Sequence, residues 1–281
     1  MSASTAAMKG LSVATLAVNM GIVITGGVVR LTGSGLGCPT WPQCTADSLV
    51  PRPALGIHGQ IEFGNRMLTY VLLAVAVVTF LVALSTKQKR LWVPSLILGL
   101  GIVGQAIVGG VSVLTKLNPW VVGLHMVISL AMIQLSVLLV RRSYSVFAHS
   151  PTDRLLGWAT FLAGWAVLYL GTVVTGAGPN AGDASSPRNG LNLDRMAQLH
   201  ADFVFLFLGL TLAWFLLRPR PKRDVRHATN LLLLAILVQG AIGYTQYFIG
   251  DPVKVVMAHL VGATVVAASL AWLFLSSTAY D

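Results

Sequence analysis

Charged side chains are scarce in this 281-residue chain. Only 10% of its residues are Asp, Glu, Lys or Arg, whereas 55% are hydrophobic and the mean hydropathy is +0.76. A water-soluble domain normally carries about 25% charged residues. The shortage therefore argues against a soluble globular protein and indicates that lipid is the solvent.

Acidic residues are the rarer sign of charge, with nine against 19 basic residues, which gives a net charge of +10. The excess does not indicate nucleic-acid binding, because the basic residues form no stripe with interleaved aromatic residues. They lie in short loops between apolar runs, as the positive-inside rule predicts. One set of loops contains most of them: Lys9, Lys87, Lys89, Arg90, Arg141, Arg142, Arg154, Arg218, Arg220, Lys222, Arg223 and Arg226.

The loops on the opposite side contain only Arg52, Lys116, Arg188 and Lys254, with Arg30, Arg66 and Arg195 at helix ends. We therefore expect a multi-pass protein of the cell (plasma) membrane with both termini in the cytoplasm.

Eight apolar runs are long enough to span a bilayer, which takes about 20 residues. The first is too long for the hydrophobic region of a signal peptide, and no A-x-A cleavage site follows it. The predicted fold class is an all-α integral membrane protein with eight transmembrane helices. These are expected at 10–30, 62–84, 91–113, 120–140, 156–177, 196–217, 229–249 and 253–275.

An internal repeat relates the two halves of the chain, because the third and fourth predicted helices match the seventh and eighth at a constant offset. The matched pairs are Gln105 and Gln239, Gly109 and Gly243, Val122 and Val256, and His125 and His259. Four helices return the chain to its starting side, so the halves are expected to be parallel repeats. We expect a four-helix half over 1–145 and another over 146–281, each able to build a site between facing helices.

Histidines are the main candidates for chemistry. His149 and His227 lie in basic cytoplasmic loops and are expected to be solvated, whereas His125, His200 and His259 lie within about 10 Å of the outer ends of their helices. An ionisable side chain at that depth is costly without a partner. His200 and His259 suit bis-histidine ligation of a flat macrocycle such as haem, and the alternative is a pair of packing histidines. Zinc is disfavoured, because no cysteine or carboxylate completes a four-ligand set beside them.

The first half is not a copy of the second, because Asn65 occupies the position that matches His200. His58, Glu62 and Asn65 share one helix face at i, i+4 and i+7. A carboxylate such as Glu62 at the membrane edge indicates proton or cation handling. The asymmetry suits a closed six-coordinate haem in the second half and a reactive substrate beside His125 in the first.

Several side chains of this region have two interpretations. Glu62 could instead form a salt bridge with Arg66, four residues later. Arg66 and Arg195 could pair with haem propionates or be interfacial residues whose charges reach toward water. Cys38 and Cys44 in the first outside loop could close a small disulfide, remain two thiols, or act as a redox dithiol.

The segment Gly27-Val-Val-Arg-Leu-Thr-Gly-Ser-Gly-Leu-Gly-Cys-Pro-Thr-Trp-Pro-Gln-Cys44, followed by Ile61-Glu-Phe-Gly-Asn-Arg66, resembles the start of the haem A synthases. The resemblance extends over essentially the whole chain. It implies a membrane oxidoreductase that oxidises the C8 methyl of haem O to a formyl through successive hydroxylations, giving haem A for terminal oxidases. It also implies a link to the farnesyltransferase that makes haem O and to cytochrome oxidase assembly.

The resemblance further implies roles for individual residues. Haem b would be held by His200 and His259, and the substrate haem O by His125. Glu62 would act as an important acid or base. The outer cysteines would correspond to the family's disulfide pair.

One departure from that family concerns Asn65, where many members carry histidine. Either His125 alone holds the substrate haem, which we prefer, or His58 approaches the iron after the start of its helix unwinds or shifts. The alternative function is a di-haem membrane electron carrier of the quinol-oxidising cytochrome b type. The asparagine argues against that carrier, which needs closed ligation at both sites. A transporter is disfavoured because the polar groups gather at the outer end rather than near the midplane.

Overall fold

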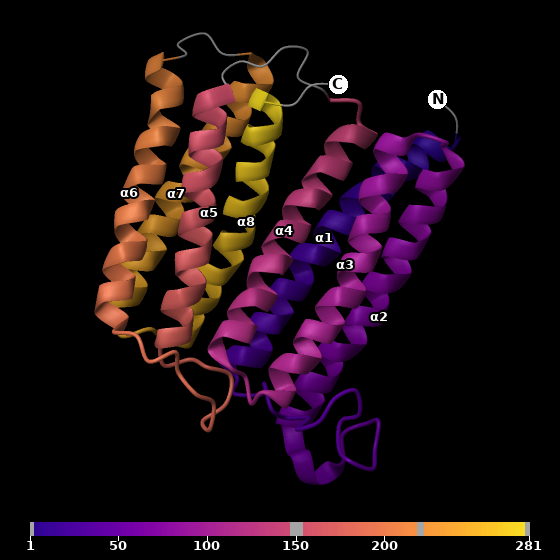
Figure 1. Cartoon of the computed structure of the whole chain (residues 1–281), viewed down its shortest axis with the longest axis vertical. Coiled ribbons are helices and arrows are strands. Elements are labelled where there is room, and N and C mark those ends of the chain that lie inside the picture. Colours follow the sequence, from indigo (N-terminus) through magenta and orange to yellow (C-terminus); the bar gives the residue numbers. More distant parts are fainter. Residues whose placement is uncertain (1–2, 147–153, 218–221, 279–281) are drawn as a thin grey trace.

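The computed structural model describes residues 3–146, 154–217 and 222–278 (Figure 1). No strand forms within these ranges, and a short 3-10 turn, η1 (Pro53–Leu55), precedes the second helix. The long helices are α1 (Ala3–Leu31), α2 (Gly56–Ser85), α3 (Lys89–Leu114), α4 (Pro119–Ser143), α5 (Arg154–Ala177), α6 (Leu193–Leu217), α7 (Arg223–Phe248) and α8 (Val253–Thr278). All eight are long and apolar enough to cross a membrane. The chain is therefore a multi-pass, all-α membrane protein, which confirms the predicted fold class.

Each predicted span overlaps one helix, and the largest differences lie at three helix starts. α1 begins at Ala3 rather than at residue 10, α2 at Gly56 rather than at residue 62, and α7 at Arg223 rather than at residue 229. The added turns of α2 contain polar residues and glycine, and those of α7 contain charged residues, which a hydropathy window rejects. A helix needs only its own backbone hydrogen bonds to continue, so these two helices extend beyond their apolar runs.

The helices form two four-helix bundles. α1 to α4 contact one another in a ring, as do α5 to α8, whereas facing helices within each described bundle have no Cα pair within 8 Å. The bundles meet through α4 and α8, with α4–α5 and α1–α8 contacts on either side. The contacts between the bundles are symmetric: if the labels of α1 and α5 are exchanged, and those of α4 and α8, the same three contacts result. Two parallel repeats are expected to meet in this way.

The two ends of the protein differ in what they carry. In Figure 1, α1 begins and α8 ends at the upper end, while the loops after α1 and α5 lie at the lower end. We call the lower end the disulfide end, because it carries the loop between Cys38 and Cys44.

Buried polar contacts supplement apolar packing between the helices. In the first bundle, Ser12 of α1 and Ser143 of α4 share a hydrogen bond of 2.7 Å. At the junction of the bundles, the Asp224 carboxylate of α7 accepts hydrogen bonds from Arg141 of α4 (2.9 Å), and from Trp272 (2.9 Å) and Ser276 (2.7 Å) of α8. Such bonds help to hold membrane helices together, because lipid provides no hydrophobic driving force between them.

Candidate functional site

Three histidines near the disulfide end occupy the same kind of cradle. Each imidazole packs with its Cε1 against a glycine of the preceding helix. A Cβ added to that glycine would lie 3.1–3.3 Å from Cε1, so the imidazole fits because the glycine has no side chain. The pairs are Gly109 and His125, Gly171 and His200, and Gly243 and His259.

The two ring nitrogens of these histidines are in different surroundings. Nδ1 of His125 and of His259 is buried and has no hydrogen-bond partner among the described residues. Nδ1 of His200 is likewise buried and without a hydrogen-bond partner among the described residues. Nε2 of each ring is accessible and forms no hydrogen bond with the described residues. An imidazole with one accessible, uncommitted nitrogen is suited to bind a metal ion.

A glutamine one turn before the glycine reinforces two of the cradles. Nε2 of Gln105 donates to the carbonyl of His125 (3.0 Å), and Nε2 of Gln239 donates to the carbonyl of His259 (2.8 Å). These bonds hold α3 against α4 and α7 against α8 at the histidine itself. The two bonds join residues that match in the sequence repeat, Gln105 with His125 and Gln239 with His259, and their spacing alone had indicated no role for the glutamines.

The second bundle has the features needed to hold a planar iron porphyrin. No Cα of α6 lies within 8 Å of α8 in the described helices, and each of these two helices carries one cradle histidine, His200 and His259. Two imidazoles on separated, facing helices form a donor set that suits axial ligation from both sides. Nε2 of each ring is accessible and has no hydrogen-bond partner among the described residues, so it is the atom that would bind the iron. The residues present therefore fit the group.

The first bundle lacks the second imidazole. Asn65 of α2 matches His200 in the repeat, and its Oδ1 accepts a hydrogen bond from the Thr25 hydroxyl of α1 at 2.8 Å. The asparagine is thus held toward α1. His125 is left as the single imidazole in such a cradle among the described residues of this bundle.

Glu62 and Arg66 attach the first loop to α2. The Glu62 side chain is 5% exposed; Oε2 accepts from the Cys38 amide at 2.5 Å, and Oε1 accepts from Arg66 at 2.5 and 3.2 Å. Arg66 also donates to the carbonyls of Cys38 (3.0 Å), Thr40 (3.0 Å) and Gln43 (3.2 Å). All five donors of the guanidinium are therefore used. The salt-bridge interpretation of Glu62 is correct in geometry, and Arg66 has no donor left for a haem propionate, contrary to one role expected for it.

The loop fastened in this way is closed by a disulfide. Cys38 and Cys44 are bonded, which confirms the expected pair, and both are fully buried. The loop backbone lies directly on the start of α2, since a Cβ at Gly37 would come within 2.2 Å of the His58 carbonyl. Glycine at position 37 is what permits this close approach.

The other predicted residues lie apart from the cradles. His58 is exposed in the first turn of α2, and its Nδ1 lies 2.9 Å from the Ser34 hydroxyl. α2 runs on as a helix to Asn65, so the unwinding that would bring His58 to an iron in the first bundle is not observed. Arg195 is exposed, and its side chain makes no hydrogen bond or ion pair within the described ranges, which leaves both of its roles open. His227 is exposed as expected, whereas His149 lies outside the described residues.

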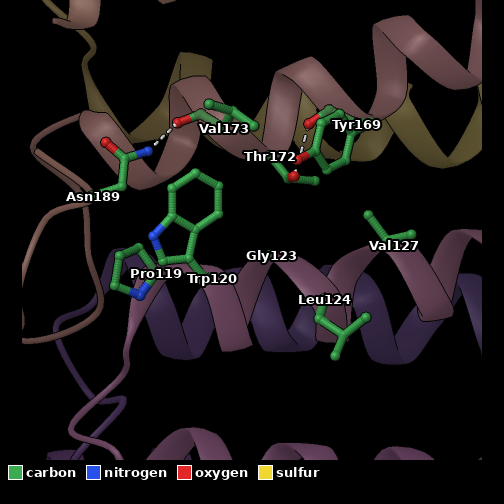
Figure 2. Close-up of a pocket in the computed structure, with 9 residues that line it drawn as sticks. All are labelled: Pro119, Trp120, Gly123, Leu124, Val127, Tyr169, Thr172, Val173 and Asn189. Carbon is green, nitrogen blue, oxygen red and sulfur yellow. Dashed lines mark hydrogen bonds between the residues drawn. The ribbon is translucent and has the colours of Figure 1, made fainter. Parts of the chain in front are cut away.

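A cavity of about 190 Å³ lies between the bundles but does not include the histidines (Figure 2). Its walls are Trp120, Gly123 and Leu124 of α4 and Tyr169, Thr172 and Val173 of α5. These α4 residues lie on the side of the helix away from His125. The cavity is therefore separate from the cradles.

The chain is similar to several proteins named heme A synthase. The chain is 24% identical to a heme A synthase of Staphylococcus epidermidis over 95% of both sequences. It is 26% identical to a heme A synthase of Listeria welshimeri over 95% of this chain and 94% of the relative. A heme A synthase of Bacillus licheniformis is 32% identical over 44% of this chain and 41% of the relative.

The sequence also matches the family COX15-CtaA, described as cytochrome oxidase assembly protein, over residues 9–58 and 55–194. The match includes the disulfide loop, Glu62, Asn65 and the cradle of His125. The chain belongs to the COX15-CtaA family of cytochrome oxidase assembly proteins.

Proposed function

We propose that this chain is a haem A synthase, a membrane oxidoreductase that oxidises the C8 methyl of haem O to a formyl and so gives haem A for terminal oxidases. Family membership and the named relatives support this proposal. The structural observation that carries it is the histidine cradle, which is paired in the second bundle and interrupted at Asn65 in the first.

The second half, residues 146–281, is the haem b site in this proposal. His200 of α6 and His259 of α8 would hold the haem iron. Gly171 and Gly243 make room for the two imidazoles, and Gln239 holds α8 at the level of His259. When bound, the iron porphyrin supplies electron-transfer chemistry that no side chain of this chain can perform.

The first half, residues 1–145, is the site for the substrate haem O. His125 binds the substrate iron from one side, and Asn65, held by Thr25, leaves the other side open. Glu62 is the single buried carboxylate among the described residues of this half, and it remains our candidate acid or base. Because Arg66 and the Cys38 amide hold its oxygens, Glu62 also fixes the disulfide loop over this end of the bundle.

The location follows from the distribution of basic residues. With most Lys and Arg on the side of the termini, both termini face the cytoplasm, and the disulfide end faces outward from the plasma membrane. An outward position also suits a disulfide, which persists in oxidising compartments. The haem O-forming farnesyltransferase is the expected supplier, and cytochrome oxidase assembly is the expected consumer. The farnesyl tail of haem O favours entry from lipid.

The open first site disfavours a di-haem electron carrier, which would need two ligands at each iron. Extracted pigments distinguish the two functions. Cells that co-express the chain with a source of haem O should accumulate haem A, as measured by chromatography of the extracted haems. Recovery of haem b alone would favour the carrier and contradict the synthase.

Ligation is tested by replacing His259 with alanine. The variant should insert normally but lose the low-spin haem b spectrum and the haem A product. His227→Ala is the matched control, because this histidine is exposed and lies in no cradle. A His259→Ala protein with an unchanged spectrum would refute the proposed ligands.

A further inference from the structure

Neither the packing of the helices nor the proposed haem ligands explain the position of the Arg30 guanidinium. It lies in the last turn of α1 and crosses to the second bundle, where Nη2 donates to the Thr175 carbonyl of α5 at 2.9 Å. Its Nε is buried and has no hydrogen-bond partner among the described residues. No carboxylate of those residues lies within salt-bridge distance of it. Arg66 uses all its donors, whereas Arg30 uses one.

A second guanidinium adds to the positive charge at this place. Arg188, in the loop between α5 and α6, adjoins Asn189, whose amide donates to the Gly176 carbonyl at 3.0 Å, next to the Thr175 carbonyl that Arg30 binds. Arg188 donates to the carbonyls of Ser186 and Pro179. Two basic residues, one from each half, thus adjoin the same end of α5, and neither forms a salt bridge with a described carboxylate.

The backbone around Arg30 maintains this arrangement. Gly182 has a φ of +102°, a conformation suited to glycine, and a Cβ there would lie 3.7 Å from Cγ of Arg30 and 3.0 Å from the Leu117 side chain. The Gly182 carbonyl accepts a hydrogen bond of 2.8 Å from the Gly35 amide. The loop after α5 is therefore attached to the loop after α1 directly beside Arg30.

An unpaired charge at a membrane edge is costly, and a neighbouring like charge adds to the cost. An anion between the two guanidinium groups would remove both penalties. We propose that Arg30 and Arg188 form an oxyanion-binding site at the junction of the bundles, suited to the carboxylate of a haem propionate. This identification of the occupant rests on the proposed function.

The position of Arg30 is consistent with a haem carboxylate. One turn before Arg30, Gly27 packs against α8, where a Cβ would meet Leu260, the residue after His259. Arg30 therefore lies nearer the disulfide end than the imidazole of His259. Propionates of a haem held at His259 would point toward that end, because carboxylates avoid hydrocarbon. A phospholipid headgroup shares this oxyanion chemistry, and the experiment separates the two sources.

The test compares iron protoporphyrin IX with its dimethyl ester, which lacks the carboxylate charges. Full-length protein made without haem is titrated with each compound, and the ratio of the two dissociation constants is determined for every variant. The wild type should favour the diacid by roughly ten- to a hundred-fold, the effect of a charge-assisted hydrogen bond. The ratio should approach one in Arg30→Gln, be partly kept in Arg30→Lys, and decrease in Arg188→Gln.

Arg52→Gln is the matched control, because Arg52 is an exposed cation of the same side that pairs with Asp47. Only the ratio of the diacid and ester dissociation constants within one variant is used. A general loss of folded protein affects both titrations equally and therefore does not change that ratio. A second measurement, native mass spectrometry with phosphatidylglycerol, reports the lipid source. If Arg30→Gln no longer retains phosphatidylglycerol but its ester ratio is unchanged, the oxyanion site is supported and its occupant is a lipid headgroup.

If neither the ester ratio nor lipid retention changes in Arg30→Gln, the proposal is wrong. Failure of the proposed function has a different signature, because cells that co-express the chain with a source of haem O would then accumulate no haem A, whatever the ester ratio. The lipid measurement would still decide whether Arg30 holds an oxyanion.

Discussion

Replacing Gly243 with alanine tests the histidine cradle directly. The new Cβ would lie 3.1 Å from Cε1 of His259 and 3.6 Å from its Nδ1, so the imidazole must retreat by a few tenths of an ångström. Functional groups need to stay within about 0.5 Å of their productive geometry. Overpacking of this kind costs about 1–3 kcal/mol, which corresponds to roughly 5- to 150-fold weaker haem binding.

Gly240→Ala is the matched control for this change. Gly240 lies three residues earlier in α7, and a Cβ there would meet no atom within 4 Å. Alanine favours a helix over glycine by about 1 kcal/mol at either position. The difference between the two variants therefore isolates the contact with His259 from the effect on the helix.

The assay is titration of the purified protein with haem, followed by the low-spin absorption spectrum. Gly243→Ala should bind haem more weakly and show a smaller low-spin fraction, whereas Gly240→Ala should match the wild type. Wild-type affinity in Gly243→Ala would refute the cradle. Equal losses in both variants would assign the effect to α7 rather than to the imidazole.

Three further predictions test other parts of the structure. Gln239→Leu removes the bond to the His259 carbonyl, worth about 1 kcal/mol, and haem titration should show a roughly five-fold loss of affinity. Asn65→His should add a second ligand to the first site, and electron paramagnetic resonance should show a new low-spin signal. Asp224→Ala leaves a buried arginine of α4 unpaired and should cost about 1–3 kcal/mol. The melting temperature of the Asp224→Ala variant should therefore fall, whereas that of the exposed control Asp47→Ala should not.

The membrane fold was largely predictable from the sequence. Apolar runs longer than a bilayer is thick, separated by basic loops, leave little freedom in the number of spans. Helix starts were less predictable, because the first turns of α2 contain His58 and other polar groups that continue the helix beyond its apolar run. The division into two four-helix halves was a prediction from the repeat; in the structure, α1 to α4 form one ring of contacts and α5 to α8 form another.

The candidate site was predictable only where the repeat pointed to it. The offset matched Gly109 with Gly243 and His125 with His259, but spacing cannot show that each glycine lies under an imidazole on the next helix. The bonds of Arg66 were out of reach for a different reason. They involve backbone carbonyls of an irregular loop, whose path has no periodic signal in the sequence. The surroundings of Arg30 could not be predicted for the same reason, because they include the irregular loop that follows α5.

The two bundles have equivalent frames but are suited to different tasks, and the differences are local. Thr25 holds Asn65 where the second bundle has an imidazole, so one ligand position is removed without disturbing the helices around it. Glu62 and Arg66 then fix a disulfide loop over the altered bundle. In the proposed function, the duplicated fold supplies two frames for haem, and the difference between them is local. Each bundle keeps a glycine and histidine cradle on its last two helices, whereas only the second bundle has an imidazole at the position of Asn65. The proposed division of labour between the halves therefore rests on side chains at equivalent positions rather than on a difference in fold.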